Sequence, residues 1–168
     1  MVSSRSARPI RHVCYLVTLA SCILLDQITK YLVERLVPVG SRIKVIGPLV
    51  ITHVRNEGGA FGIFQGSPVG LGLLGIGLLC AVALWWRCDS SAVRSPWGLV
   101  FLGSGSFGNL IDRLARRAVV DFIDVGFWPV FNAADSFILA GVVLLAWTAV
   151  SGMRQTDSST GVCDGHTD

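Results

Sequence analysis

Charged residues are scarce in this chain: they make up 15% of its 168 residues, whereas hydrophobic residues make up 52%. A soluble domain of this size carries about 25% charged residues. The charges that are present cluster between long apolar runs, which is typical of membrane spans joined by short loops. The composition therefore argues against an ordinary soluble domain and predicts one compact membrane unit, with no room for a second domain.

Dense basic segments and regular cysteine motifs are also absent. The net charge is only +3, and no run of Lys and Arg is dense enough to indicate nucleic-acid binding. The five cysteines show no CxxC pattern and no other metal-ligand spacing, and three of them lie in apolar runs, where cysteine packs as a small hydrophobic residue. We therefore expect no disulfide framework, no metal site and no nucleic-acid partner.

The sequence does contain apolar segments long enough to cross a bilayer as helices. The clearest is 68–86, which is uncharged for 19 residues and at about 1.5 Å per residue covers the hydrocarbon core. Glycines in this span and the next allow helices to approach closely. We predict an all-α integral membrane protein with four transmembrane helices, over residues 12–36, 68–86, 97–113 and 133–150.

One segment between the spans has the pattern of strands. Residues 41–64 are rich in β-branched side chains and contain the turn signal Gly47-Pro48, so we predict a small β-hairpin or sheet there, outside the hydrocarbon. The segment 114–131 is predicted to be a loop. Residues 1–11 and 151–168 are predicted to be polar tails, the second of them disordered.

The orientation in the membrane follows from the basic residues before the first span. Arg5, Arg8 and Arg11 favour a cytoplasmic N-terminus, although in total the inside segments would hold six Lys and Arg residues, against seven in the two outside loops plus Lys30. Four spans then place both termini in the cytoplasm. Segments 41–64 and 114–131 share the extracytoplasmic side.

Ionisable side chains at membrane depth are costly and indicate a functional site by default. Asp26 and Lys30 lie four residues apart on one helix face, where they can pair, and a structural and a direct role are equally open. Asn109 and Arg113 share a face at the end of the third span, either as an interfacial anchor or as a hold on a substrate. Asp112, with Arg113 beside it, is expected to be a paired, ionised group.

The segment Asn56–Gly59 directly follows the predicted strands. Its two glycines, Gly58 and Gly59, permit a positive φ and the close approach of another backbone. The segment is either an ordinary glycine turn or a clamp for an extended substrate, with Asn56 donating a hydrogen bond to a backbone carbonyl.

Two aspartates are the candidates for catalysis. Asp121 lies among Val, Phe and Ile residues, which disfavour its charged form. If Asn132 caps the fourth span, Asp135 lies in its first turn, where the helix dipole favours a carboxylate, although acids are common at helix starts. Two carboxyls in such different settings can divide acid and base roles, a chemistry that needs neither a metal nor a Ser or Cys nucleophile. Sequence spacing alone allows Asp124 to replace Asp121.

Five polar motifs, in this order, resemble those of the bacterial lipoprotein signal peptidases, also called signal peptidase II. The resemblance covers roughly residues 12–150, and five motifs in order between the expected spans are far more specific than any one alone. The motifs are Asp26-Gln27-Ile28-Thr29-Lys30, Asn56-Glu57-Gly58-Gly59-Ala60-Phe61, Gly108-Asn109-Leu110-Ile111-Asp112-Arg113, Val120-Asp121-Phe122-Ile123 and Phe131-Asn132-Ala133-Ala134-Asp135-Ser136.

The resemblance implies an aspartic endopeptidase of the bacterial inner membrane that acts without a cofactor. Its substrate would be a diacylglyceryl-modified prolipoprotein, cut just before the lipidated Cys, and its other partners would be membrane lipids. The enzyme is expected to be a monomer with its site near the extracytoplasmic face. The catalytic dyad falls on Asp121 and Asp135, and Asp26 and Lys30 fall on a mainly structural motif. Substrate-holding or dyad-supporting positions fall on Asn56, Gly59, Asn109, Arg113 and Asn132.

The sequence is open to three other interpretations. Leu19-Ala20-Ser21-Cys22 is similar to a lipobox, so the chain could itself be a lipoprotein, but the apolar run continues to Leu25 and further spans follow. A small transporter or channel subunit could use the intramembrane Asp and Asn residues to bind ions, but no internal repeat is visible. A purely structural scaffold would leave the polar clusters unexplained.

Overall fold

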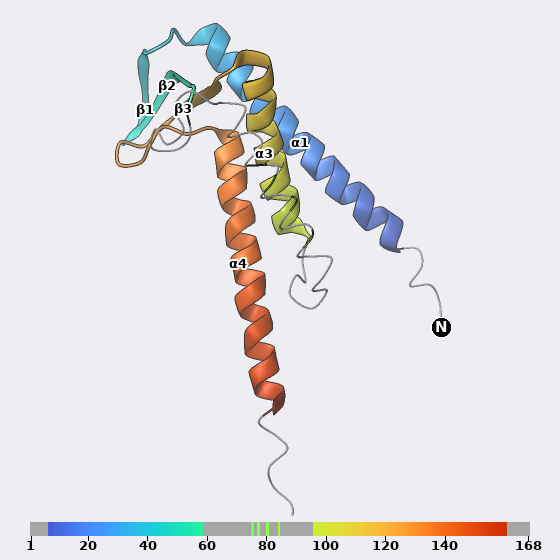
Figure 1. Cartoon of the computed structure of the whole chain (residues 1–168). Coiled ribbons are helices and arrows are strands. Elements are labelled where there is room, and N and C mark those ends of the chain that lie inside the picture. Colours follow the sequence, from blue (N-terminus) through green and yellow to red (C-terminus); the bar gives the residue numbers. More distant parts are fainter. Residues whose placement is uncertain are drawn as a thin grey trace, which may run out of the picture.

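The computed structural model describes residues 7–58 and 96–160, together with Gly75, Gly77, Cys80 and Leu84. In this part of the chain, three long helices and a small sheet are arranged with the sheet at one end of the helices (Figure 1). Apart from those four residues, the predicted span 68–86 lies outside the described residues. So do Gly59 with the rest of 59–67, the segments 1–6 and 87–95, and the tail 161–168.

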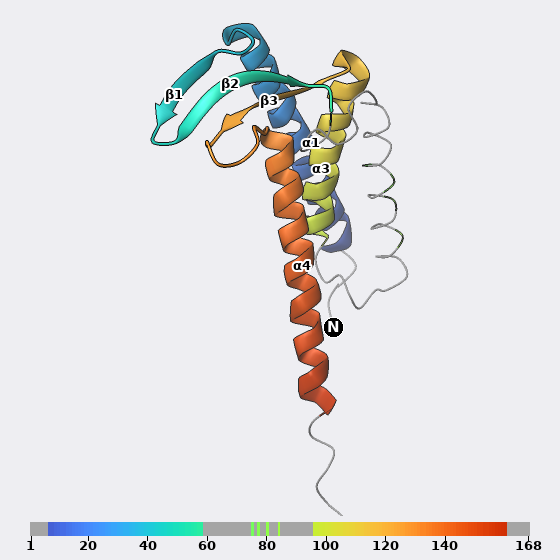
Figure 2. The same ribbon diagram turned by 60° about the vertical axis from the view of Figure 1, so that its left-hand side comes forward.

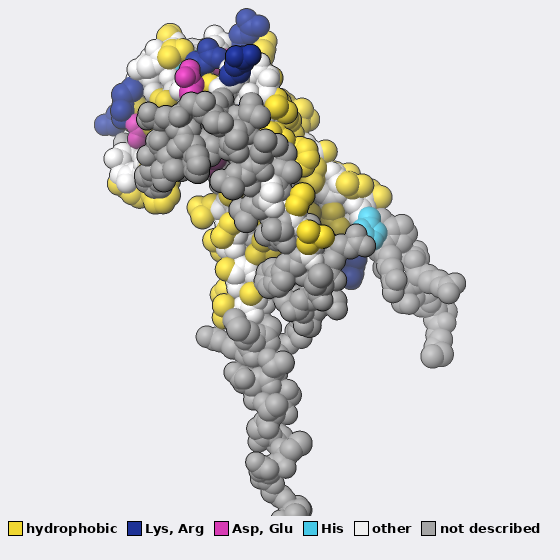
Figure 3. Space-filling view, in the orientation of Figure 1, with side chains coloured by type: hydrophobic (Ala, Val, Ile, Leu, Met, Phe, Trp, Pro, Cys, Tyr) yellow, Lys and Arg dark blue, Asp and Glu magenta, His cyan; other side chains and the backbone are white. Residues whose placement is uncertain are grey.

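Two helices are long and apolar enough to cross a membrane, judged by length and composition. They are α1 (Ala7–Leu36), through its segment Ile10–Leu36, and α4 (Ala133–Thr160), through Ala133–Ser151. Large apolar side chains such as Leu16 and Trp147 point outward and are mostly exposed. In Figure 3 hydrophobic side chains cover the helices, while most Lys and Arg side chains gather at the sheet end. This distribution suits helices that face lipid tails.

Both of these helices are longer than the sequence pattern predicted. The helix α1 begins at Ala7 rather than near residue 12, because Pro9 falls in its first turn, where proline is tolerated. The helix α4 continues to Thr160, ten residues beyond the predicted end at Val150, so residues 151–160 are helical rather than disordered. The segment after Ser151 contains helix formers and no proline, and polarity alone does not end a helix.

The predicted third span is the helix α3 (Trp97–Arg116), which packs against both α1 and α4. Its contact with α4 depends on glycines. A Cβ added at Gly105 would collide with the backbone oxygen of Ala134, and one at Gly98 would lie 2.6 Å from Cγ of Leu145. Gly141 of α4 is equally close to the backbone of α3. Small residues thus bring the two helices together at backbone distance, as the sequence suggested.

The sheet is antiparallel, in the order β1 (Arg42–Ile46), β2 (Leu49–Asn56) and β3 (Val119–Asp124). The first two strands form the predicted hairpin. The third strand corrects the prediction that 114–131 is a loop throughout. Arg117, in the left-handed region with φ of 59°, ends α3 and turns the chain into β3. Nearly all of β3 is buried, so it shows no alternation of polar and apolar residues that would reveal a strand.

The sheet is fixed to the helices by a small apolar core. Val33 and Val37, at the end of α1, pack with Val120 and Phe122 of β3. Figure 2 shows the result from a second side: β3 passes over the end of the helices where α1 and α3 finish and α4 begins. The polar ends of three helices and the buried strand therefore meet in one place.

Candidate active site

Asp121 lies in the middle of β3 and is 3% exposed. Its two carboxyl oxygens accept hydrogen bonds from two amides, Nδ2 of Asn132 at 2.6 Å and Nδ2 of Asn56 at 2.9 Å. Burial raises the pKa of Asp121 to about 6, and the charge of Asp135 adds to the rise, while the two amide hydrogen bonds and the charge of Lys30 oppose it. This carboxyl therefore keeps its proton at a pH where most aspartates have lost theirs.

Asp135 lies in the first turn of α4, as predicted, and Asn132 caps that helix. The backbone N–H of Asp135 donates to Oδ1 of Asn132 at 3.0 Å, and the backbone N–H of Asn132 donates to Oδ2 of Asp135 at 3.2 Å. This reciprocal pair has the form of a capping box and fixes the carboxyl at the start of the helix. The other carboxyl oxygen, Oδ1, accepts from Nδ2 of Asn109 at 2.8 Å.

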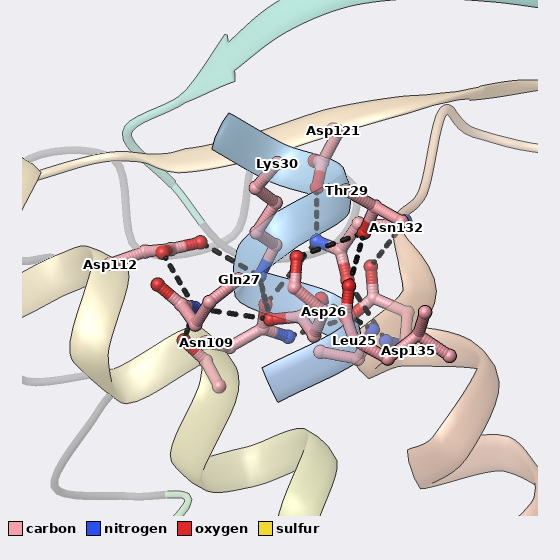
Figure 4. Close-up of polar contacts among 12 residues, drawn as sticks. Leu25, Asp26, Gln27, Thr29, Lys30, Asn109, Asp112, Asp121, Asn132 and Asp135 are labelled. Carbon is pink, nitrogen blue, oxygen red and sulfur yellow. Dashed lines mark hydrogen bonds and ion pairs between the residues drawn. The ribbon is translucent and has the colours of Figure 1, made fainter. Parts of the chain in front are cut away.

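Two asparagine amides connect the carboxyls of Asp121 and Asp135. Asn132 is fully buried, and its Nδ2 donates both to Asp121 and to Oδ1 of Asn109 at 3.2 Å. Asn109 in turn donates to Asp135. Figure 4 shows the chain of contacts from Asp121 through Asn132 and Asn109 to Asp135. The two acids are thus held in one network that joins β3, α3 and α4.

The predicted ion pair between Asp26 and Lys30 is present, with 2.8 Å between Oδ2 and Nζ, and both side chains are fully buried. The other oxygen of Asp26 accepts from the backbone N–H of Ala134 at 2.8 Å, which ties α1 to the start of α4. Lys30 also pairs with Asp112 at 2.7 Å and donates to Oδ1 of Asn109 at 2.9 Å. Through Lys30, this buried charged cluster contacts Asn109, one of the two asparagines that connect the acids.

Asp112 is paired, as expected, but not with its neighbour Arg113. Its partners are Lys30 and Arg116, because residues four apart share a helix face and adjacent residues do not. Gln27 completes the cluster by donating to Oδ1 of Asp112 at 3.1 Å. Sequence reasoning gave Gln27 and Arg116 no role in the site, although the spacing of Asp112 and Arg116 was a usable signal.

Asp124 faces a different environment from Asp121. It pairs with Arg42 at 2.6 Å and accepts from the backbone N–H of Gly126 at 2.8 Å. Three positions apart on a strand, Asp121 and Asp124 point to opposite faces. Within the described part of the chain, Asp121 lines a cavity, described in the next paragraph, and Asp124 does not.

A cavity of about 1230 Å³ opens beside the two acids. Its lining contains polar and apolar residues, and part of the apolar lining lies on α4. Arg113 lines the cavity. Among the described residues its guanidinium donates one long hydrogen bond, of 3.3 Å, to the backbone oxygen of Asn109, out of five N–H groups that it can donate. The polar lining includes Asn56, Gly58, Asn109, Asp121 and Asp135, and the apolar lining includes Phe127, Trp128, Leu139, Ala140 and Val143.

The arrangement suits acid–base chemistry on a long, partly apolar ligand. Two carboxyls on one cavity, one of them with a raised pKa, can take a proton from a water molecule and deliver one to a leaving group. Among the described residues, no three His, Cys, Asp or Glu side chains are grouped as metal ligands would be. Gly59, the remaining predicted site residue, lies outside the described residues.

Comparison with known proteins gives consistent matches. The family model described as Signal peptidase (SPase) II matches residues 18–151. The lipoprotein signal peptidase of Mycobacterium avium (strain 104) is 38% identical over 156 residues, covering 86% of this chain and 84% of that protein. The lipoprotein signal peptidase of Syntrophomonas wolfei subsp. wolfei is 36% identical over 137 residues, covering 79% and 91%. A solved structure of a bacterial membrane enzyme, obtained by the in meso method at 2.3 Å resolution, has a TM-score of 0.70 at 28% identity, covering 92% of this chain and 94% of that one.

Proposed function

The chain belongs to the signal peptidase II family, the peptidases that remove signal peptides from prolipoproteins, and we propose that Asp121 and Asp135 are its catalytic pair. One observation carries the assignment: these two carboxyls line the same cavity and are joined through the amides of Asn132 and Asn109. The substrate is a prolipoprotein whose Cys carries diacylglycerol. The bond cut is the peptide bond just before that Cys.

The two acids have different roles. Asp121 starts protonated, because burial raises its pKa to about 6. Asp135 accepts hydrogen bonds at both oxygens, an arrangement that suits a carboxylate, and it serves as the base. A water molecule between them attacks the carbonyl carbon while Asp135 takes its proton. Asp121 supplies a proton to the departing amine as the C–N bond breaks, leaving the signal peptide with a new carboxyl group and the lipidated Cys with a free amine.

The cavity accounts for both halves of this substrate. The extended peptide lies along the polar lining, where Asn56 and Arg113 offer donors to its backbone carbonyls. The clamp that the sequence predicts is the motif Asn56–Gly59. The acyl chains lie along the apolar lining formed by Leu139 and Val143 of α4, whose side chains are exposed at the surface of the protein. Donors fixed in a dry site also stabilise the oxyanion that develops during attack.

The membrane arrangement is part of the proposal. The enzyme crosses the bacterial inner membrane four times, with both termini in the cytoplasm and the site near the extracytoplasmic face, and it works as a monomer among membrane lipids. Two apolar helices support the membrane location. The start of α1 and the coloured C-terminal part of α4 also lie away from the sheet (Figure 1).

The experiment uses the purified protein in detergent and a prolipoprotein supplied in two forms, with and without diacylglycerol on its Cys. Cleavage is followed by gel shift, and the new N-terminus is identified by mass spectrometry. We expect cleavage of the lipidated form alone, at the bond before the Cys. Cleavage elsewhere, or equal cleavage of both forms, would contradict the substrate assignment. Failure of the folded protein to cleave either form would contradict the peptidase assignment and favour an ion-binding or transport role.

A further inference from the structure

Lys30 is a buried lysine that contacts the hydrogen-bond network of the catalytic pair at Asn109. Three oxygen atoms lie within 2.9 Å of its Nζ, as many as an ammonium group has hydrogens. Two belong to the carboxylates of Asp26 and Asp112, and the third is Oδ1 of Asn109. Charge neutralisation within a buried cluster explains the first two contacts. The contact with Asn109 needs a separate explanation, because it leads directly to the site.

An ammonium group can donate hydrogen bonds but cannot accept them, so it decides which end of the Asn109 amide faces it. With Oδ1 toward Lys30, the Nδ2 group faces Asp135 and donates to that carboxylate at 2.8 Å. Asn132 reinforces this orientation by donating to the same Oδ1 at 3.2 Å. If the amide were turned over, its oxygen would face the carboxylate and its NH₂ would face the ammonium, and both contacts would be repulsive.

We infer that Lys30 is a positioning residue for the peptidase reaction: its ammonium holds the Asn109 amide in the one orientation that donates to Asp135. The inference rests on the proposed function, since it assumes that Asp135 is one of the two catalytic acids. Within the described chain the polar contacts of Lys30 are with Asp26, Asp112 and Asn109, so it acts on the pair through Asn109 and through its charge.

The charge of Lys30 gives the inference a second readout. Asp121 is raised in pKa chiefly by burial, and Lys30 is one of the groups that oppose this rise. The other charged groups near Asp121 are Asp135, at the start of α4, and Arg113, on α3. Loss of the ammonium therefore raises the pKa of Asp121 further and moves the alkaline limb of the activity profile to higher pH.

The test replaces Lys30 by methionine, which keeps an unbranched side chain and removes the charge. For Lys30→Met we expect kcat to fall about 10- to 100-fold, the loss of one oriented hydrogen bond to a charged group, with KM for the lipidated substrate little changed. The exposed Lys44 on β1 provides the matched control, and Lys44→Met should behave as the wild type. A wild-type kcat in Lys30→Met would overturn the inference.

A purely structural role for Lys30 is separated from positioning by restoring the charge balance. Lys30→Met/Asp112→Asn removes one charge of each sign, so it folds even where the single variant does not. We expect the double variant to remain slow. Full recovery of kcat would mean that Lys30 only neutralises the buried carboxylates, and the positioning role would be wrong.

A double-mutant cycle with Asn109 tests the route of the effect. Asn109→Ala should itself lower kcat, and adding Lys30→Met to it should cost little more, because the link to Asp135 is already broken. The inference would be contradicted if the kcat losses of the two single variants multiplied in the double variant. An undiminished kcat in Asn109→Ala would also contradict it, and this outcome can be measured even if no Lys30 variant folds. Cleavage by the wild type is the reference throughout, since its absence counts against the proposed function rather than against Lys30.

Discussion

Asp121→Asn should stabilise the protein at neutral pH while it strongly lowers activity. Asp121 is 3% exposed, and burial raises its pKa from 3.8 to about 6. Below the lower value the carboxyl is protonated in both the folded and the unfolded state, and burial of its charge costs nothing. As the pH rises through this window, the unfolded state ionises first and the folded state loses stability. At about 1.4 kcal/mol per pKa unit, the cost above the window reaches about 3 kcal/mol.

The substitution removes this cost but weakens the hydrogen bonding. The new amide has one oxygen, so it can accept from only one of the two donors, Asn56 and Asn132, and its NH₂ faces the other. This mismatch costs about 1–2 kcal/mol. We therefore expect Asp121→Asn to be less stable than the wild type at low pH and more stable, by about 1–2 kcal/mol, above the window.

The assay is thermal unfolding in detergent micelles, from roughly pH 4 to pH 8. Asp124→Asn on the same strand is the matched control. Its amide oxygen can still accept from the backbone N–H of Gly126, so the change breaks the ion pair with Arg42, which is 64% exposed, and should lower stability by at most about 1 kcal/mol. The reasoning is refuted if the difference in Tm between Asp121→Asn and the wild type does not change across this range.

Three further predictions follow from the packing and the charges. Gly105→Ala should destabilise the protein by about 1–3 kcal/mol, since its Cβ collides with the Ala134 backbone. Gly103→Ala should be tolerated, since the nearest atom among the described residues lies 4.0 Å from its Cβ, and the Tm values of the two variants test this. The kcat/KM of the wild type should fall above about pH 6 as Asp121 loses its proton, and a profile flat through that pH would count against its acid role. Asn56→Ala removes a hydrogen bond that lowers the pKa of Asp121, so the same profile should shift to higher pH; an unshifted profile would show that this contact does not tune the acid.

Hydropathy and turn signals predicted the helices and the hairpin, and missed one strand. The segments around α1, α3 and α4 are apolar over lengths that leave few alternatives. The strand β3 escaped because it is buried on nearly every position and carries two acids, so it has neither alternation nor a continuous apolar run. Pairing with β2 decides its conformation, and pairing between segments distant in the sequence cannot be predicted from the local sequence pattern.

The candidate site was predictable where its geometry is local. Asn132 and Asp135 are three residues apart, and their capping arrangement follows from the preferences of a helix start. The link between Lys30 and Asn109 joins residues 79 positions apart and depends on how α1 packs against α3, so spacing could not give it. For the same reason Asp112 was expected to pair with its sequence neighbour rather than with a lysine on another helix.

The most direct test of the catalytic pair is single-turnover cleavage of a diacylglyceryl-modified prolipoprotein by three variants, each first shown to be folded. For Asp121→Asn and Asp135→Asn we expect rates lower by about 10²- to 10⁴-fold, the usual contribution of a general acid or base. For Asp124→Asn we expect a rate close to that of the wild type. Activity retained in Asp121→Asn together with its loss in Asp124→Asn would contradict the assignment of Asp121 and make Asp124, the other acid of β3, the partner of Asp135.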